Sequence, residues 1–172
     1  GGRRHALASS IAAKREFAGS WEYLLDEAIF TKPVHPNWGG TGLIDRNGRL
    51  VGVGSLFIQD AGPDGTDGNM VVPIDVLKPI LGTMQKTGHT GRPPRPWLGL
   101  YAAETDETIV VAGMASAGPA SQGGLMIGDE IVKVAGAPIQ GLSDFFRNVW
   151  GLGHAGVDIP LTVRREESGE HE

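Results

Sequence analysis

The sequence predicts a mainly β protein in which short strands alternate with tight turns. The 172 residues include 27 glycines and 11 prolines, which favour turns over long helices. Runs of β-branched and aliphatic residues lie between them, as in Leu50–Ile58. The pair Asn47 and Gly48 precedes that run, and Asn-Gly is the strongest short hairpin signal. A chain of this length can hold one or two domains.

Charge and composition argue against several classes of function. The net charge is -5, and the basic residues are scattered as pairs, which disfavours nucleic acid and anionic membrane as partners. No apolar run approaches the roughly 20 residues of a membrane span. There are no cysteines, and the five histidines lack the spacing of zinc ligands. We therefore expect no metal, no cofactor and no membrane span.

The N-terminal segments allow two interpretations. The segment His5–Phe17 contains Ala, Lys and Glu, which favour a helix, yet alternate residues from Leu7 to Ala13 would share one face of a strand. Trp21–Thr31 shows an apolar stripe at helical spacing. Propensity alone predicts helices here. The extreme N-terminus shows no charged region followed by an apolar core, so we expect any export signal to lie upstream of this chain.

The middle of the chain predicts a hairpin, a further strand and a helix. Gly42–Asp45 and Leu50–Ile58 are expected to pair as strands, and Asn69–Pro73 to form another. A helix is expected to begin at Pro73, which suits a first helical turn, and Pro79 should bend or interrupt it. The apolar residues that recur at helical spacing are Ile74, Leu77, Leu81 and Met84. Residues 87–96 lack periodicity and are rich in proline, which predicts a semi-rigid linker.

The segment Val34–Ile44 (V-H-P-N-W-G-G-T-G-L-I) resembles the nucleophile loop of trypsin-like serine proteases, written G-N-S-G-G. The five loop positions are taken, in order, by Pro36, Asn37, Trp38, Gly39 and Gly40. Trp38 thus stands where the resemblance places the nucleophile, and indole has no nucleophilic oxygen. Pro36 stands at an oxyanion-hole position, and proline has no amide hydrogen. The resemblance therefore implies a degenerate site with no catalytic residue.

The segments after this loop resemble HtrA-type (Do- or DegP-like) serine proteases from Thr41 to Leu81. The matching features are the Asn-Gly hairpin and N-M-V-V-P-I-D-V-L, which is similar to the family's F-A-I-P-I-N-M-V-K. This resemblance implies that residues 1–86 are the C-terminal portion of a trypsin-like barrel, whose first two segments are strands. The family's catalytic histidine and aspartate belong to an N-terminal barrel with no counterpart here, so we expect a fragment or one piece of a longer protein. His35 is interpreted as a turn residue rather than a base.

The second half of the chain resembles the PDZ domains of the same family. Trp97–Tyr101 (W-L-G-L-Y) is similar to their carboxylate-binding loop. Gly118–Leu125 matches a short helix, and Gly128–Gly136 matches G-D-x-I-x-x-x-N-G. The resemblance implies a PDZ domain over residues 97–167, an α+β, partly open barrel, followed by a charged, frayed tail over 168–172. Within it, Ser143 is expected to cap a helix from Asp144 to Gly151.

The resemblance also implies a peptide-binding site. The amides of Leu98, Gly99 and Leu100 are expected to converge on a terminal carboxylate, while the peptide adds as a strand beside the second helix. Phe146 and Trp150 are explained equally well as core residues. The expected peptide-binding residues are Trp97, Leu98, Gly99, Leu100, Tyr101, Phe145, Phe146, Val149 and Trp150.

Three hypotheses about function follow. The first is a catalytically inactive HtrA-like protein whose PDZ domain binds C-terminal or extended peptides of partner proteins. The alternative is a serine endopeptidase for protein quality control in the full-length protein. A third is a structural assembly module, because half a barrel exposes strand edges to a second copy or to an N-terminal barrel half. A periplasmic or cell-envelope location is what the resemblance implies.

Overall fold

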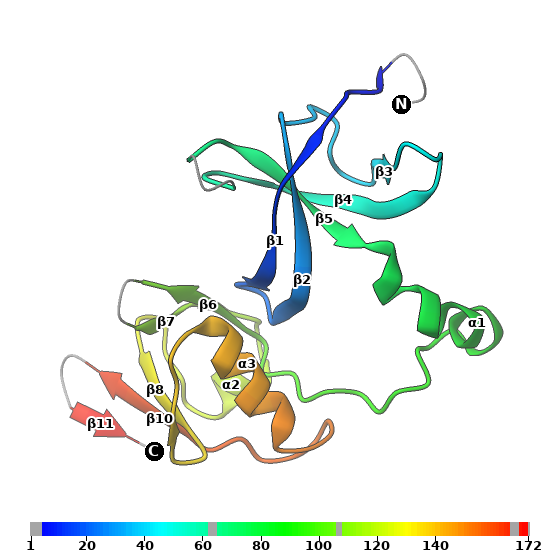
Figure 1. The fold of residues 1–172 in the computed structure, drawn as a ribbon. Coiled ribbons are helices and arrows are strands. Elements are labelled where there is room, and N and C mark those ends of the chain that lie inside the picture. Colours follow the sequence, from blue (N-terminus) through cyan, green and yellow to red (C-terminus); the bar gives the residue numbers. More distant parts are fainter. Residues whose placement is uncertain (1–4, 62–64, 106–107, 166–168, 172) are drawn as a thin grey trace. The chain divides into compact units, whose positions relative to one another are not determined.

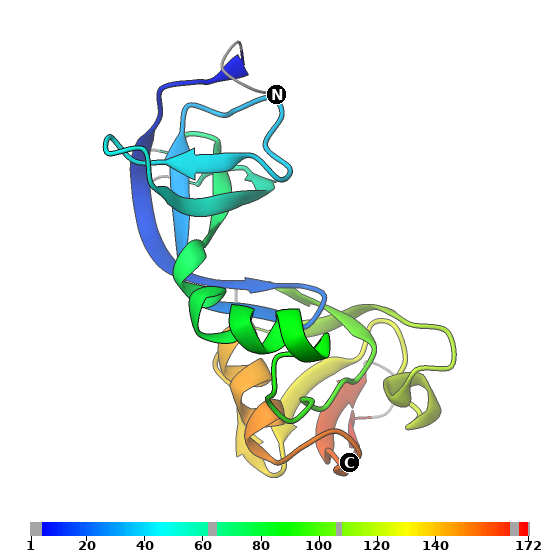
Figure 2. The ribbon, with the colours of Figure 1, turned by 90° about the vertical axis from the view of Figure 1, so that its right-hand side faces the viewer.

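The computed structural model describes residues 5–61, 65–105, 108–165 and 169–171. The chain divides into two compact units. The first comprises residues 1–17 and 25–92, and the second comprises residues 18–24 and 93–172. Figures 1 and 2 show the elements of both units. The short segment 18–24 therefore belongs to the second unit, although its neighbours in sequence belong to the first.

The first sheet has five strands in the order β1-β2-β5-β4-β3. The β2–β5, β5–β4 and β4–β3 pairs are antiparallel. The strands are β1 Ser10–Gly19, β2 Tyr23–Lys32, β3 Gly42–Ile44, β4 Leu50–Ile58 and β5 Gly68–Pro73. Both N-terminal segments are thus strands, as the family resemblance implies, and the helices favoured by propensity alone are wrong. The order of strands has two free ends, so the sheet is not closed.

Burial explains why β2 does not look like a strand in the sequence. Four consecutive residues of this strand, Ala28 to Thr31, are buried. A strand covered on both faces lacks the alternation of a half-buried one. The ring of Phe30 lies 6.3 Å from that of Phe17, and the Arg15 guanidinium sits 4.1 Å from the centre of the Phe30 ring. Packing against the rest of the unit therefore overrides local propensity here.

The turn between β3 and β4 is fixed by the side chain of Asp45. Its carboxylate accepts hydrogen bonds from the amides of Asn47 at 2.8 Å and Arg49 at 2.9 Å. Gly48 follows with a φ of 77°, a conformation that glycine adopts at little cost. The hydrogen bond from Arg49, helped by those from Asn47, lowers the pKa of Asp45. The turn thus favours the ionised carboxylate.

The segment after β5 forms two short helical pieces rather than one helix. A 3-10 turn covers Ile74–Val76, and α1 covers Lys78–Thr87 and ends at Gly88 with a φ of 77°. The expected interruption at Pro79 is therefore misplaced. Pro79 lies in the first turn of α1, where its missing amide hydrogen costs nothing, and the break comes before it.

The second unit contains a sheet in the order β11-β10-β8-β7-β6, with β9 paired to β8. Its elements are β6 Leu100–Glu104, β7 Ile109–Met114, α2 Pro119–Gln122, β8 Glu130–Val134, β9 Ala137–Pro138, α3 Leu142–Gly151, β10 Leu161–Arg165 and β11 Gly169–His171. The expectation of a frayed tail is wrong for residues 169–171, because their backbone pairs with β10. Residues 168 and 172 lie outside the described part of the chain. The strand β6 stands at one end of the order, so one of its edges is free of the sheet.

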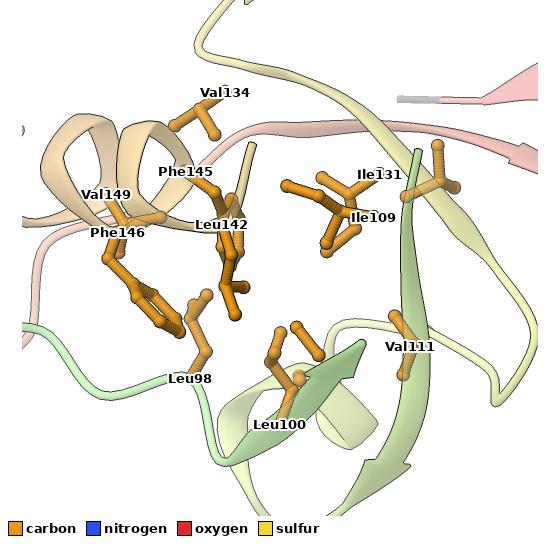
Figure 3. Packing of buried hydrophobic residues seen from close by; sticks show 13 residues of the cluster. Leu98, Leu100, Ile109, Val111, Ile131, Val134, Leu142, Phe145, Phe146 and Val149 are labelled. Carbon is orange, nitrogen blue, oxygen red and sulfur yellow. The ribbon is translucent and has the colours of Figure 1, made fainter. Parts of the chain in front are cut away.

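The core of this unit lies between α3 and the sheet (Figure 3). From α3, Leu142, Phe145, Phe146 and Val149 are buried, and they meet aliphatic side chains from the sheet. The sheet-side members of this cluster are Leu98, Leu100, Ala102, Ile109, Val111, Ile131, Val134 and Val163. The helix begins at Leu142 after Gly141, so Ser143 lies inside its first turn and is not the cap that we expected.

The Gly-Asp motif supplies a buried ion pair. The side chain of Asp129 is 1% exposed and receives two hydrogen bonds from Arg165, both of 2.6 Å. Its Oδ2 also accepts the amide of Met126 at 2.9 Å. The hydrogen bond to Asp129 raises the pKa of Arg165. This aspartate therefore ties the loop before β8 to the end of β10.

Removal of the Phe145 side chain is expected to destabilise the second unit strongly. Phe145 is completely buried, and truncation of such a side chain to alanine typically lowers the free energy of unfolding by about 3–5 kcal/mol. Urea denaturation of Phe145→Ala should show this loss. The matched control is Ile127→Ala, because Ile127 is 68% exposed, and its effect should stay within about 0.5 kcal/mol. Equal effects of the two substitutions would contradict the assigned core.

The two neighbouring arginines of β10 should differ in their effect on stability. Arg165→Met leaves the buried Asp129 carboxylate without its bidentate partner, and an uncompensated buried charge is costly. Arg164→Met removes a more exposed pair with Glu130, which contributes little. Thermal unfolding should therefore show a clearly lower midpoint for Arg165→Met than for Arg164→Met. Identical midpoints would show that Asp129 does not depend on this partner.

Candidate functional site

The loop around Trp38 in the first unit is held by its backbone. The amide of Thr41 donates to the Trp38 carbonyl at 3.1 Å, and the amide of Gly40 donates to the Gly54 carbonyl at 2.9 Å. A β-carbon at Gly54 would lie 2.2 Å from the Trp38 carbonyl oxygen, so only glycine fits there. The Thr41 hydroxyl donates to the carbonyl of Asn37. Trp38 is half-buried, and Pro36 and Asn37 are exposed.

Both ring nitrogens of His35 form hydrogen bonds with backbone groups. Its Nδ1 accepts the amide of Asn37 at 3.0 Å, which places the ring proton on Nε2. The Nε2 atom lies 2.7 Å from the carbonyl of His5 and donates to it. The His35 amide donates to Oδ1 of Asn69 at 2.7 Å. The ring thus stabilises the turn, with neither nitrogen directed at a nucleophile.

A cavity borders this loop within the first unit, and Leu7, His35, Trp38, Leu43, Asn69 and Val71 are among the residues that line it. The Nδ2 atom of Asn69 is buried and has no hydrogen-bond partner among the described residues. The lining offers no pair of a nucleophile and a base in hydrogen-bond contact, because the loop hydroxyl and the imidazole are both bonded to carbonyls or amides of the backbone.

In the second unit, three consecutive amides converge on one carboxylate. The Oε1 atom of Glu22 accepts hydrogen bonds from Leu98 at 3.2 Å, Gly99 at 2.7 Å and Leu100 at 3.3 Å. Its Oε2 atom accepts a further bond from Leu98 at 3.0 Å. The three amides therefore bind a carboxylate, and the bound group is a side chain of the same unit.

The direction of these amides follows from what holds their carbonyls. The carbonyl of Leu98 accepts the amide of Ala120 at 2.8 Å, and the carbonyl of Gly99 accepts the amide of Ala115 at 2.7 Å. Gly99 has a φ of 72°, which turns successive amides toward the same point. The side chains of Leu98 and Leu100 are buried in the core (Figure 3). The amides are thus left to face a ligand.

The free edge of β6 receives a backbone hydrogen bond from the same segment that supplies the carboxylate. The amide of Ala102 donates to the carbonyl of Ser20 at 2.9 Å. Ser20 precedes Glu22 by two residues, and Ala102 follows Leu100 by two. The Ser20 carbonyl and the Glu22 carboxylate thus accept hydrogen bonds from the free edge of β6 and from the loop before it.

The side chains of the predicted peptide-binding residues differ in their exposure to solvent. Leu98, Leu100, Phe145, Phe146 and Val149 are buried members of the core. Trp97 and Tyr101 are 59% and 50% exposed. Trp150 is half-buried, stacks on Phe146 with ring centres 5.4 Å apart, and carries the Arg95 guanidinium at 4.4 Å.

Sequence reasoning missed Ser20 and Glu22. These residues lie about 80 positions before their partners in the sequence, with separations of 76 to 78 for the Glu22 bonds. An acidic residue in a turn is ordinarily solvated, so nothing in the local sequence indicates a ligand role. Only the two observations together, a glutamate in a hairpin turn and a carboxylate-binding loop, could have suggested it.

Other features of the described residues add no further chemistry. A second cavity in the second unit is lined by Trp97, Leu98, Ala120, Leu125, Ile159 and Leu161, among others, with no residue of α3. The described part of the chain contains no group of three His, Cys, Asp or Glu side chains placed to hold a metal ion. None of its described helices is long and apolar enough to cross a membrane.

Comparison with known proteins identifies the family of this chain. Residues 96–171 match the sequence profile of the PDZ domain. A probable periplasmic serine endoprotease, DegP-like, of Pseudomonas fluorescens is 31% identical over 147 residues, which cover 78% of this chain and 30% of that protein. The serine endoprotease DegS of Haemophilus influenzae is 31% identical over 102 residues, 57% of this chain and 29% of that protein.

Among solved structures, the HtrA-type protease AlgW with a decapeptide matches with 24% identity and a TM-score of 0.47, over 84% of this chain and 47% of that one. The chain thus spans about a third or less of the length of the curated relatives named above. With a PDZ domain and the two sequence relatives in agreement, the chain is a PDZ-containing homologue of the DegP and DegS serine endoproteases, the HtrA type.

Proposed function

We propose that this chain acts as a non-catalytic HtrA-type polypeptide whose PDZ domain, residues 97–167, binds C-terminal or extended peptides of partner proteins. The observation that carries the proposal is the convergence of the Leu98, Gly99 and Leu100 amides on a single carboxylate oxygen. A peptide's terminal carboxylate has the same chemistry as the glutamate side chain that the loop holds. The loop is therefore suited in its chemistry to the carboxylate of a C-terminus.

Two further features support peptide binding. Hydrogen bonds to a charged acceptor are stronger than those between neutral groups, and three of them share one oxygen here. The edge of β6 offers the Ala102 amide two residues beyond the loop, so an extended chain can add as a strand. For such a chain, the side chains of Trp97 and Tyr101 are the exposed members of the predicted set.

The absence of catalysis is proposed on two grounds. Trp38 takes the place of the nucleophile, and an indole cannot attack a carbonyl. Pro36 removes one oxyanion donor, and the loss of one such donor typically lowers turnover by about a hundredfold to a thousandfold. The alternative, serine endopeptidase activity in a longer polypeptide, is favoured by the names of the relatives, which are endoproteases.

The names of the relatives support a location, and the sheet edges of the first unit support a mode of assembly. We propose a periplasmic or cell-envelope location, because the DegP-like relatives are named as periplasmic. The free edges of the first sheet, at β1 and β3, suit pairing with a second copy or with an N-terminal barrel half. In this proposal the first unit is the carrier of the peptide-binding domain, and residues 87–96 link the two.

A library of peptides should bind this chain through the free C-terminal carboxylate. Fluorescence anisotropy is expected to give micromolar dissociation constants for the best free-acid peptides. Amidation of the same peptides should weaken binding by about tenfold or more, because a hydrogen bond to a charged group contributes about 1.5–3 kcal/mol. Binding that is indifferent to amidation would contradict carboxylate capture.

Gly99→Ala should weaken this binding while a matched glycine substitution does not. A β-carbon at Gly99 would lie 3.1 Å from the Trp97 ring at a φ of 72°, so the loop must shift. Gly124 is also left-handed, with a φ of 87°, but has no atom within 4 Å of the added carbon. Gly124→Ala thus carries the backbone cost without touching the loop. Equal affinity of the two variants would place the carboxylate elsewhere.

Fluorophosphonate labelling should fail on this chain and on any longer polypeptide that contains it. Trp38 offers no hydroxyl for phosphonylation, so mass spectrometry is expected to show no adduct, whereas an active trypsin-like protease in the same reaction is labelled. Trp38→Ser should stay unlabelled in this chain, because both ring nitrogens of His35 are engaged by backbone groups and neither can deprotonate the new hydroxyl. Stoichiometric labelling of the natural sequence would favour the endopeptidase alternative.

A further inference from the structure

We propose that the hairpin tip, defined as residues 18–24, is a built-in ligand of the PDZ domain that a peptide must displace before it can bind. The tip belongs to the same compact unit as the domain. Its Glu22 carboxylate fills the loop of amides. The competition that follows presupposes the peptide-binding function proposed above and adds the regulation of that same site.

The tip imitates a C-terminal peptide in its carboxylate and in one backbone hydrogen bond to β6. The Glu22 carboxylate takes the place of a terminal carboxylate on the amides of Leu98, Gly99 and Leu100. Two residues earlier, the Ser20 carbonyl accepts the Ala102 amide at 2.9 Å. Residues 20–22 form a turn, so these contacts are one backbone hydrogen bond and one side-chain carboxylate held by three amides, rather than a paired strand. A bound peptide would need both of these donors.

Apolar contacts and backbone geometry support the same arrangement. Ala18 and Leu24, at the two ends of the tip, pack against the core cluster of the domain. Trp21 stacks on Tyr23 with ring centres 5.8 Å apart, and its indole lies over Gly19, where a β-carbon would meet it at 3.0 Å. The tip is thus a packed turn, and the carboxylate is one of several groups that hold it.

The backbone of Glu22 is in an uncommon conformation for its type. Its φ is 60°, in the left-handed region, which is disfavoured for a non-glycine residue. Four hydrogen bonds to its carboxylate compensate this cost only while the tip is in place. The carboxylate is therefore one of the groups on which the closed arrangement depends.

Peptide affinity must then reflect the fraction of molecules in which the tip is released. The apparent dissociation constant equals the intrinsic one divided by the released fraction. If about one molecule in ten is open, the apparent affinity is about tenfold below the intrinsic affinity. Substitutions that weaken the contacts of the tip should thus strengthen peptide binding. Substitutions that displace the loop amides should abolish it.

The test compares Glu22→Gln and Glu22→Ala with the natural sequence, using the free-acid peptide library and its amidated counterparts. Glu22→Ala removes both oxygens and should increase affinity on the order of tenfold. Glu22→Gln keeps one neutral acceptor and should give a smaller increase. Glu27→Gln is the matched control, because Glu27 pairs with Lys14 at an exposed position, and it should leave affinity unchanged. Equal affinities for all four proteins would overturn the proposed competition while leaving peptide binding intact.

A second measurement tests the occupancy without a peptide. Amide hydrogen exchange, resolved by residue, should show protection of Leu98, Gly99 and Leu100 in the natural sequence and faster exchange, on the order of tenfold, in Glu22→Ala. The amide of Ala115 donates to the Gly99 carbonyl and should keep its protection, which would show that the loop itself remains folded. Unchanged exchange at the three amides would overturn the inference.

The two measurements separate the proposals. If no protein of the set binds any free-acid peptide, but Glu22→Ala exposes the three amides, then the tip occupies the loop and the peptide-binding function fails. If the peptides bind the natural sequence and Glu22→Ala equally, and exchange is unchanged, then the function stands and the built-in ligand fails.

Discussion

The second unit depends on how Leu98, in the loop before β6, and Leu100, at the start of β6, are anchored. The side chains of Leu98 and Leu100 are buried against α3, and the carbonyls of Leu98 and Gly99 accept amides from the segments before and within α2. With side chains and carbonyls both committed to the interior, only the amides remain for a ligand. The carboxylate site is thus a by-product of core packing, which explains why a change in the core would also reach the site.

The Trp38 loop of the first unit is held without any contact that needs a particular side chain at position 38. Backbone hydrogen bonds join Gly40 to Gly54 and Thr41 to Trp38, the side chains of His35 and Thr41 bond the backbone of Asn37, and the close approach to β4 rests on the absence of a side chain at Gly54. None of these features requires a serine at position 38 or an amide hydrogen at position 36. Stability and catalysis therefore place separate demands on this segment, and the second demand can be relaxed without disturbing the first.

Much of the fold could be predicted from the sequence, because several motifs carry their own geometry. Asn47-Gly48 fixes the β3–β4 turn, and the Gly-Asp pair before β8 fixes a buried ion pair. Local propensity failed for the first two strands, since β2 is buried on both faces and so lacks alternation. The break expected at Pro79 and the cap expected at Ser143 were misplaced, because both residues lie in the first turn of their helices.

Of the two partners in the carboxylate site, the sequence predicted the loop of amides but not the group that they bind. Consecutive backbone amides follow from W-L-G-L in the sequence, whereas the group that fills them depends on a contact across 76 residues. No periodicity or spacing encodes such a contact. A glutamate in a turn gives no sign of its partner until the strands on either side of it are placed.

The tether of Glu22 to the domain sets a scale for what a competing ligand must overcome. A group attached to the same chain acts at an effective concentration that is set by the length and stiffness of the connection, and 76 residues separate Glu22 from Leu98. To displace Glu22, a free peptide must reach a concentration equal to that effective concentration multiplied by the ratio of the peptide's dissociation constant to that of the tip. The threshold for occupancy can thus be tuned by substitutions in a seven-residue turn, leaving the recognition surface, and with it the choice of partner, unaltered.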